Sequence, residues 1–204
     1  MKLGLSSLFG AALLSIATLA GTSAQAQSLE LGYPSYGGTG CPAGSASAVL
    51  SPDNSTLSIL FDQYTVEAGG VTGRSIDRKS CNLAIPVRVP SGYSISLVAV
   101  DYRGYAAIPH GGRGNMQAEY FFAGVRGPRS VKNFGGGFNN VYTLTDNLVA
   151  SAMVWSPCGA NTTLRVNTSL MAQTNSSFQQ ALATVDSVDV SSGIVYHVQW
   201  RQCF

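Results

Sequence analysis

The sequence predicts an all-β protein, an antiparallel β-sandwich of jelly-roll-like or barrel-like form that is stapled by two disulfides. Three observations indicate this fold. Apolar and polar residues alternate along short runs, the runs recur about every ten residues between glycine- or proline-containing turns, and four cysteines are spread along the chain. Alternation with a period of two is typical of strands with one buried face. Short strands at such spacing favour a sandwich or a barrel.

The expected strands follow one another from residue 55 to the C-terminus. They occupy residues 55–68, 81–90, 93–108, 118–125, 141–146, 151–155, 163–172, 183–190 and 194–203. Pro86 interrupts one run, and because proline cannot donate to a β-ladder it indicates an edge strand or a bulge. Residues 178–185 are the one stretch that could form a helical turn. No repeat and no linker divides the pattern.

The first 26 residues have the layout of a secretory signal peptide. Lys2 precedes a mostly apolar stretch over residues 3–20, and Ala24-Gln25-Ala26 is a small-x-small cleavage site. Serines, a threonine and glycines inside the stretch favour cleavage after Ala26 over a membrane anchor, and no later stretch could span a bilayer. We therefore expect a secreted, extracellular protein. Its expected parts are a signal peptide (1–26), an extended Gly/Pro/Ser-rich lead-in (27–44) and a single β domain (45–204).

The cysteines predict disulfides rather than a metal site. Cys41, Cys81, Cys158 and Cys203 all follow the expected cleavage site, and none lies in the close-spaced pairs that zinc prefers. Four cysteines allow three connectivities. We expect the local one, Cys41 with Cys81 and Cys158 with Cys203, in which the second bond holds the last strand in place.

The charge balance gives no general attraction for nucleic acid or an anionic membrane. The chain has 12 Lys and Arg against 10 Asp and Glu, and cleavage would remove Lys2 from that count. Arg113, Arg126, Arg129 and Lys132 form a loose basic group, which we interpret as a solvated loop. We expect no nucleic-acid partner and no membrane span in the mature chain, and the sequence does not predict the oligomeric state.

Catalytic and cofactor-binding motifs are scarce. His110 and His197 are the only histidines, no G-x-S-x-G elbow is present, and the glycine-rich stretches lack the lysine of a phosphate-binding loop. A pair of carboxylates for glycan hydrolysis cannot be recognised from sequence alone. Asp186 and Asp189 are weak candidates for a calcium site, but their spacing does not fit a calcium-binding loop, so a structural role is favoured. We expect no cofactor and no metal, and we lean against an enzyme without deciding it.

Candidate ligand-binding residues lie in loops and beside turns. Residues 126–140 carry Phe134 and Phe138 on either side of three glycines, and Tyr102 and Tyr105 are further candidates for contact with a sugar. Phenylalanines that fold back onto the core are the alternative. Trp155 and Trp200, each near a cysteine, are expected to be core residues.

Four N-x-S/T sequons make the protein a candidate glycoprotein if the source organism glycosylates exported chains. Their asparagines are Asn54, Asn161, Asn167 and Asn175.

The cysteine contexts together resemble a known family. In chain order, GTGCPAGS (38–45), KSCNLAIPVRVPSGYS (79–94), VDYRGYA (100–106), WSPCG (155–159), TVDS (184–187) and YHVQWRQC (196–203) are similar to the secreted domain-of-unknown-function family numbered 4360. Lys79-Ser80-Cys81 stands where a Lys-Asn-Cys start would be expected. The resemblance implies a small exported protein with paired cysteines, and it implies no activity, cofactor or catalytic residue.

The function that these observations favour is a non-catalytic extracellular protein that binds a cell-surface or cell-wall component, with a cell-wall polysaccharide or a surface protein as partner. One alternative is a carboxylate-based glycan hydrolase. The other is a secreted effector or inhibitor that binds a protein partner through an exposed apolar patch, for which Phe134–Phe138 is the candidate.

Overall fold

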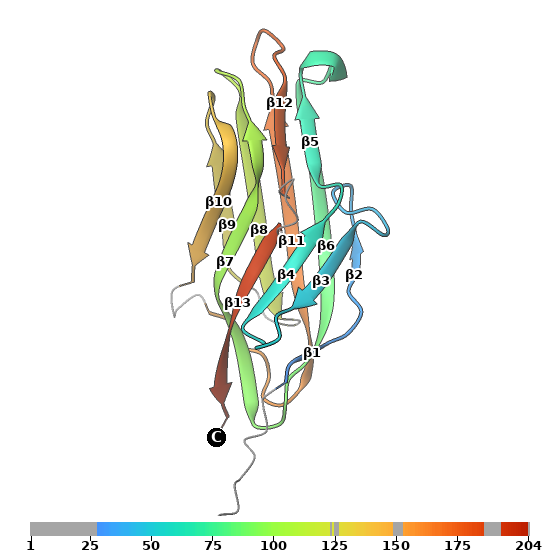
Figure 1. Cartoon of the computed structure of the whole chain (residues 1–204), viewed down its shortest axis with the longest axis vertical. Coiled ribbons are helices and arrows are strands. Elements are labelled where there is room, and N and C mark those ends of the chain that lie inside the picture. The colour runs from blue at the N-terminus through green and yellow to red at the C-terminus, as the bar shows by residue number, and fades with distance from the viewer. Residues whose placement is uncertain (1–27, 123, 125–126, 149–152, 186–192, 204) are drawn as a thin grey trace, which may run out of the picture.

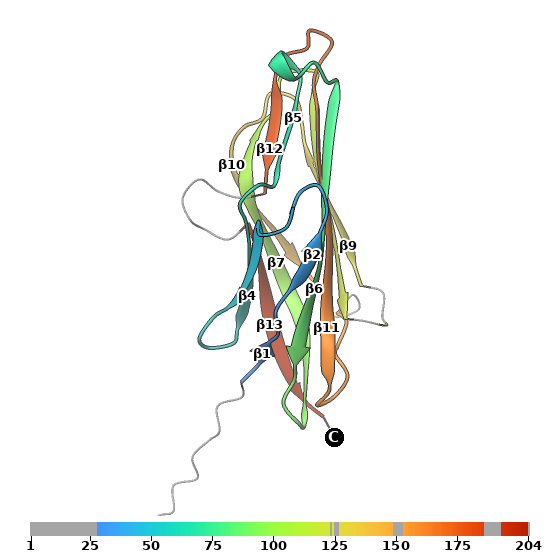
Figure 2. The ribbon, with the colours of Figure 1, turned by 90° about the vertical axis from the view of Figure 1, so that its right-hand side faces the viewer.

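The computed structural model describes residues 28–122, 124, 127–148, 153–185 and 193–203. Two antiparallel sheets pack face to face as a sandwich, seen in front view in Figure 1 and edge-on in Figure 2. Antiparallel sheets with one buried face produce the alternation seen in the sequence. The predicted fold class is confirmed.

Sheet A has six strands in the order β1-β6-β11-β8-β9, with β2 also beside β6. Its strands are β1 (Glu30–Leu31), β2 (Ser35–Gly37), β6 (Ile76–Arg88), β8 (Arg113–Phe122), β9 (Arg129–Phe134) and β11 (Asn161–Gln173).

Sheet B has seven strands in the order β3-β4-β13-β7-β12-β5, with β10 also beside β7. Its strands are β3 (Ala46–Leu50), β4 (Thr56–Phe61), β5 (Thr65–Ala68), β7 (Tyr93–Ala107), β10 (Asn139–Asn147), β12 (Ala181–Thr184) and β13 (Ile194–Gln202), and a short 3-10 helix, η1 (Gly70–Thr72), follows β5.

The core lies between the sheets and follows the alternation of each strand. In β11 the side chains of Leu164, Val166, Thr168 and Leu170 are buried, while the alternate residues Arg165, Asn167 and Ser169 face outward. Full burial of a side chain of this size contributes about 1.5–3 kcal/mol. A shift of one residue in register would turn the whole apolar set to solvent, so the alternation fixes the register.

Several local features differ from the sequence interpretation, among them β3 and β9, which lie where no strand was expected. Residues 178–185 form no helical turn, because Ala181–Thr184 pair with both β5 and β7 as strand β12. The lead-in also contributes to the sandwich, since β1 and β2 both pair with β6.

Pro86 lies in β6 beside the gap between β1 and β2 of the lead-in. It pairs with Thr163 of β11 on one side, and on the other side the backbone N–H of Gly32 donates to the Pro86 carbonyl at 2.8 Å. In an antiparallel ladder the N–H and C=O of one residue point the same way. The N–H that proline lacks would therefore face the short break between β1 and β2, and the pairing with β11 is kept.

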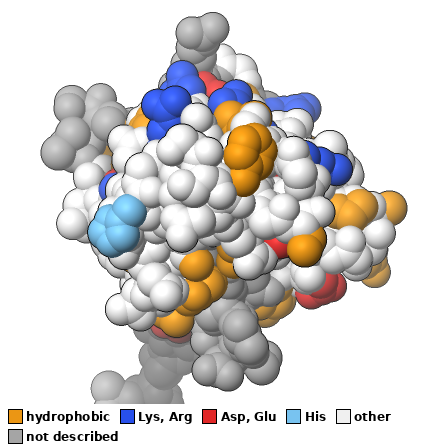
Figure 3. All heavy atoms as spheres, turned by 90° about the horizontal axis from the view of Figure 1, so that it is seen from above, with side chains coloured by type: hydrophobic (Ala, Val, Ile, Leu, Met, Phe, Trp, Pro, Cys, Tyr) orange, Lys and Arg blue, Asp and Glu red, His pale blue; other side chains and the backbone are white. Residues whose placement is uncertain are grey.

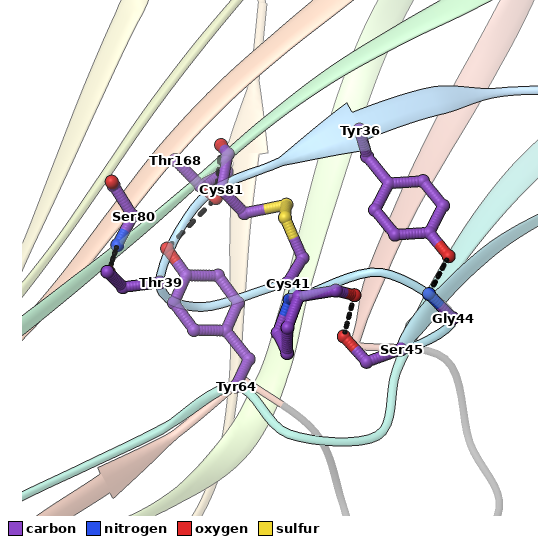
Figure 4. Close-up of a disulfide and its surroundings, with 10 residues drawn as sticks. Tyr36, Thr39, Cys41, Gly44, Ser45, Tyr64, Ser80, Cys81 and Thr168 are labelled. Atoms are coloured by element: carbon purple, nitrogen blue, oxygen red, sulfur yellow. Dashed lines mark hydrogen bonds between the residues drawn. A yellow bond between two sulfur atoms is a disulfide. The ribbon is translucent and has the colours of Figure 1, made fainter.

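Both expected disulfides are present. The Cys41–Cys81 bond joins the lead-in to β6, with a Cα–Cα distance of 5.3 Å and both residues fully buried. Figure 4 shows the ring of Tyr64 beside it, and the Tyr64 hydroxyl shares a 3.0 Å hydrogen bond with Thr168 Oγ1. The bond therefore lies in the core rather than at the surface.

The Cys158–Cys203 bond holds the C-terminal strand in the middle of sheet B. Its Cα–Cα distance is 6.1 Å, and the Cys203 backbone N–H also donates to the Gly92 carbonyl at 2.8 Å. Strand β13 lies between β4 and β7, so loss of this strand would divide sheet B.

Within the described ranges, no helix has the length and apolar character needed to cross a membrane.

Candidate binding face

The outward side chains of β6, β11, β8 and β9 form a continuous surface on sheet A, called here the polar face. Amide and hydroxyl groups dominate it, together with three arginines, one glutamate and three apolar side chains. Its members are Ile76, Arg78, Ser80, Asn82, Arg113, Asn115, Gln117, Glu119, Arg129, Val131, Asn133, Asn167, Ser169, Met171 and Gln173.

Strand register arranges these side chains in rows across the sheet. Asn167 of β11 lies opposite Asn82 of β6 on one side and Glu119 of β8 on the other. One row further along β11, Ser169 lies opposite Ser80 and Gln117 in the same way. Neighbouring strands are about 4.8 Å apart, so each row presents hydrogen-bonding groups at short, regular intervals.

A chain of hydrogen bonds fixes several of the amides. Arg129 donates to the side-chain oxygen of Gln117, Gln117 Nε2 donates to Asn115 Oδ1 at 2.8 Å, and Asn115 Nδ2 donates to Asn133 Oδ1 at 2.7 Å. Side chains that are already ordered lose less entropy when a ligand binds. The amides of β8 and β9 are thus preorganised.

The polar face is hollowed in two places that share Gln117. The first depression, of about 550 Å³, lies near the ends of the strands that include Ile76, Arg113 and Gln173. The second, of about 650 Å³, lies over Asn82, Glu119 and Asn167. Both volumes fall within the range usual for ligand sites, about 300–1,000 Å³.

Positive charge is concentrated on this side of the molecule. Arg78, Arg113 and Arg129 line the two depressions, whereas Glu119 is the one acidic residue among their described lining residues. Viewed from above (Figure 3), Lys and Arg side chains gather along one side of the molecule. The near-balanced charge of the whole chain is therefore unevenly distributed.

The four basic residues that were expected to form a solvated loop do not lie together in the structure. Arg113 and Arg129 are strand residues that face outward on the polar face, and Lys132 instead points inward and pairs with Asp146 of β10. Arg126 lies outside the described residues. Inward-pointing charges on edge strands such as β9 protect a sheet against edge-to-edge association.

The two phenylalanines of the candidate ligand loop pack onto the core. Phe134 is only 3% exposed, and its ring centroid lies 5.6 Å from that of Phe138 and 4.7 Å from that of Tyr142. Phe134 nevertheless borders the first depression of the polar face. Its ring can support a ligand from below but is not displayed as an exposed platform.

The two candidate tyrosines have different environments. Tyr102 is buried, and its hydroxyl has no hydrogen-bond partner among the described residues. Burial, followed by the nearby Tyr120 and Asp146, raises the pKa of Tyr102 far above its ordinary value. Tyr105 is partly exposed and donates to Asn139 Oδ1 at 2.5 Å on the outer side of sheet B. Neither tyrosine lines the polar face.

Both tryptophans are partly buried, and each has an ordered partner. Trp200 packs edge-to-face on Tyr93, with ring centroids 6.1 Å apart, and borders the core. The guanidinium of Arg201 lies 4.2 Å from the ring centroid of Trp155.

The four sequon asparagines differ in accessibility. Asn161 is exposed at the start of β11, and Asn54 lies in a turn with a φ of 56°. Asn167 lies on the polar face. Asn175 Nδ2 donates one hydrogen to the His110 carbonyl at 2.8 Å and the other to Gln179 Oε1 at 2.6 Å, so both hydrogens of the Asn175 amide are used.

Asp186 and Asp189 lie outside the described residues. Among the described residues, no group of three or more His, Cys, Asp and Glu side chains could hold a metal ion.

Asp101 of β7 is held between two side chains on the outer side of sheet B. His197 Nε2 lies 2.9 Å from Asp101 Oδ2, and Thr145 Oγ1 donates to Asp101 Oδ1 at 2.5 Å. Burial acts to raise the pKa of Asp101, but the hydrogen bonds from Thr145 and His197 and the charges of His197 and Arg103 outweigh it and lower the pKa.

The lowered pKa predicts acid sensitivity. A carboxyl group whose pKa is lower in the folded state stabilises the fold above its unfolded-state pKa of about 3.9, and this contribution is lost as the pH falls through the folded-state pKa. Asp101→Asn should therefore flatten the pH dependence of the free energy of unfolding below about pH 4, and Thr145→Ala should flatten it partly. Urea unfolding at several acidic pH values measures this pH dependence for both variants. If the free energy of unfolding of Asp101→Asn fell with pH as steeply as that of the unmodified protein, Asp101 would not be the source of the acid sensitivity.

The chain as a whole is similar to known proteins. A family described as "Domain of unknown function (DUF4360)" matches residues 27–203. An uncharacterized secreted protein of Arthroderma benhamiae is 38% identical over 169 residues, which cover 82% of this chain and 69% of that protein.

Two solved structures are also similar, but only remotely. One is TmCBM61 in complex with beta-1,4-galactotriose, with a TM-score of 0.28, 8% identity, and coverage of 83% of this chain and 88% of the other. The second is the enzymatically active domain of bacteriophage CBA120 tailspike protein 4, with a TM-score of 0.23, 12% identity, and coverage of 88% and 20% respectively. At these TM-scores neither structure informs the fold or the function.

Proposed function

Because the chain belongs to the DUF4360 family, whose function is unknown, we propose a function from its own surface: it binds a cell-surface or cell-wall polysaccharide through the polar face of sheet A. The observation that carries the proposal is the array of outward amide and hydroxyl groups, in register across four strands and hollowed in two places.

The chemistry of the array suits a polymer of sugars. Each amide offers both donors and acceptors, and each sugar hydroxyl can also donate and accept, so the two surfaces can satisfy one another. An extended site over four strands can contact several sugar units at once. Many modest hydrogen bonds, each with a net contribution of about 0.5–1.5 kcal/mol, would then add to useful affinity.

The same surface favours binding over hydrolysis. Glycosidases of the common types need two carboxyl groups on either side of the scissile bond. Among the described residues that line the depressions, Glu119 is the one carboxylate. The polar face therefore supports recognition of a glycan without its cleavage.

The compartment agrees with such a ligand. The protein is secreted, as is its relative from Arthroderma benhamiae, and two disulfides suit an oxidising environment. We further propose that residues 1–26 are removed on export, and that Asn161, exposed at the start of β11, is the sequon asparagine most open to glycosylation.

Loss of amides from the polar face should weaken retention on polysaccharide. The purified, oxidised protein is sedimented with insoluble cellulose, chitin or β-glucan, and released sugar is assayed in the same tubes. On whichever polymer retains the protein, the Asn82→Ala/Asn167→Ala variant should bind about tenfold more weakly, because two modest hydrogen bonds are lost.

The control variant removes two exposed amides from sheet B. Asn140→Ala/Gln199→Ala should bind like the unmodified protein, since both residues are exposed on β10 and β13. Equal loss in the two variants would contradict the location of the site. Released sugar would instead support an enzyme and make Glu119 the next target.

A further inference from the structure

Two arginines of the first depression face solvent without an acidic partner. Arg78 has no hydrogen bond or ion pair with any described residue. Arg113 is held through its Nε, which donates to Gln173 Oε1 at 2.7 Å, and its terminal nitrogens have no partner in the described part of the chain. Both guanidinium groups therefore keep their paired N–H donors available.

The sheet positions these groups on either side of β11. Arg78 of β6 lies opposite Met171, and Arg113 of β8 lies opposite Gln173. The two arginines therefore lie in different rows, two residues apart along β11. With two inter-strand spacings across the sheet and two residues along it, their Cα atoms are about 12 Å apart. Two arginines at this separation can hold two anionic groups of one chain.

Apolar side chains also line the first depression. Met171 of β11 lies on the strand between the two arginines, Ile76 lies on β6, and the buried ring of Phe134 belongs to β9 on the far side of β8. A sugar ring presents C–H groups on its faces and polar groups around its edge. The depression offers both kinds of contact, with apolar side chains and guanidinium donors among its lining residues.

We propose that the polar face binds a polysaccharide that carries carboxylates, and that Arg78 and Arg113 bind the carboxylates in the first depression. This inference rests on the proposed function and names the class of polymer. Guanidinium and carboxylate form paired, charge-assisted hydrogen bonds, which are stronger than bonds between neutral groups.

A nucleic acid fits the same surface less well. Single strands are bound by exposed aromatic rings on which bases stack, and Phe134, the one aromatic among the described residues that line the two depressions, is buried. The chain also lacks the large excess of positive charge that is typical of nucleic-acid-binding proteins.

The test compares one polysaccharide with and without its carboxylate charges. Polygalacturonate and fully methyl-esterified polygalacturonate differ only in the carboxylate, and binding of the full chain to each is measured by calorimetry at two salt concentrations. We expect the de-esterified polymer to bind at least about tenfold more tightly, and added salt to weaken this binding.

Four variants distinguish a specific contact from a general electrostatic attraction. Arg78→Ala and Arg113→Ala should each weaken binding to polygalacturonate by about tenfold, because a charge-assisted bond is lost. Arg78→Lys should recover part of the affinity, since it keeps the charge without the planar fork. Arg201→Ala, which removes the same charge from sheet B, should change affinity less than twofold.

Several results would overturn the inference. Equal affinity for the two polymers would do so, as would a loss in Arg201→Ala equal to that in Arg78→Ala, or tighter binding to single-stranded DNA at the same salt concentration. If a neutral polymer binds and Asn82→Ala/Asn167→Ala weakens it, the proposed function stands and this inference alone fails. If no polymer binds, both fail.

Discussion

The double variant Cys158→Ala/Cys203→Ala is expected to lose about 4 kcal/mol of its free energy of unfolding. The bond closes a loop with a sequence separation of 45 residues, and in the loop-entropy model a cross-link of that span restricts the unfolded chain by about this amount. Loss of the bond should also destabilise the folded state, because the bond holds the end of β13 in the middle of sheet B. Chemical denaturation of both proteins under oxidising conditions measures the difference.

Reduction supplies the control for this expectation. In a strong reductant both proteins lack the cross-link, so their free energies of unfolding should converge. An unchanged stability of the variant under oxidising conditions would show that β13 is held by its ladder alone, and that the terminal cysteine is dispensable for the fold.

Gly104→Ala is expected to destabilise the protein by about 3 kcal/mol, the upper part of the range for overpacked sites. A Cβ atom at position 104 of β7 would lie 2.1 Å from the Thr184 carbonyl oxygen and 2.7 Å from the Tyr142 hydroxyl. That carbonyl accepts a 2.6 Å hydrogen bond from the same tyrosine. The backbone would have to move, and the hydrogen bond would weaken as it did.

Gly37→Ala is the matched control, because Gly37 also lies in a strand and a Cβ atom there would meet nothing within 4 Å. Its unfolding midpoint should stay within the range of an ordinary surface substitution, about 0.5 kcal/mol either way. Similar midpoints for Gly104→Ala and Gly37→Ala would mean that β7 and the end of β12 are less closely packed than the structure shows.

The fold was largely predictable because alternation is a local property of the chain. The buried set Leu164, Val166 and Leu170 can be identified without knowing what β11 packs against, since a strand with one buried face must alternate. The disulfide pairing also followed from sequence spacing. The start of β12 was not predicted, since the expected strand began at residue 183 and Ala181–Leu182 fell in the possible helical turn. Its pairing with β5 and β7 is a long-range contact that overrides weak local preference.

The polar face was much harder to predict, because it depends on which strands become neighbours. Arg78 and Arg113 are far apart in the sequence, and only the order β6-β11-β8 brings them to the two sides of one strand. The alternation that continues from Arg113 through Asn115 and Gln117 could have shown that Arg113 belongs to a strand and faces outward, rather than to a loop. Its neighbours across the sheet could not be inferred without the topology.

The most direct test of the central claim is to map the bound polysaccharide onto the protein. Isotope-labelled protein is titrated with soluble oligosaccharides made from the polymer that retains it, and backbone amide chemical shifts are followed by NMR. Binding by the polar face predicts that the largest shifts occur in β6, β11 and β8, around Asn82, Asn167 and Gln117. Shifts confined to sheet B, or no shifts with any polymer, would contradict it.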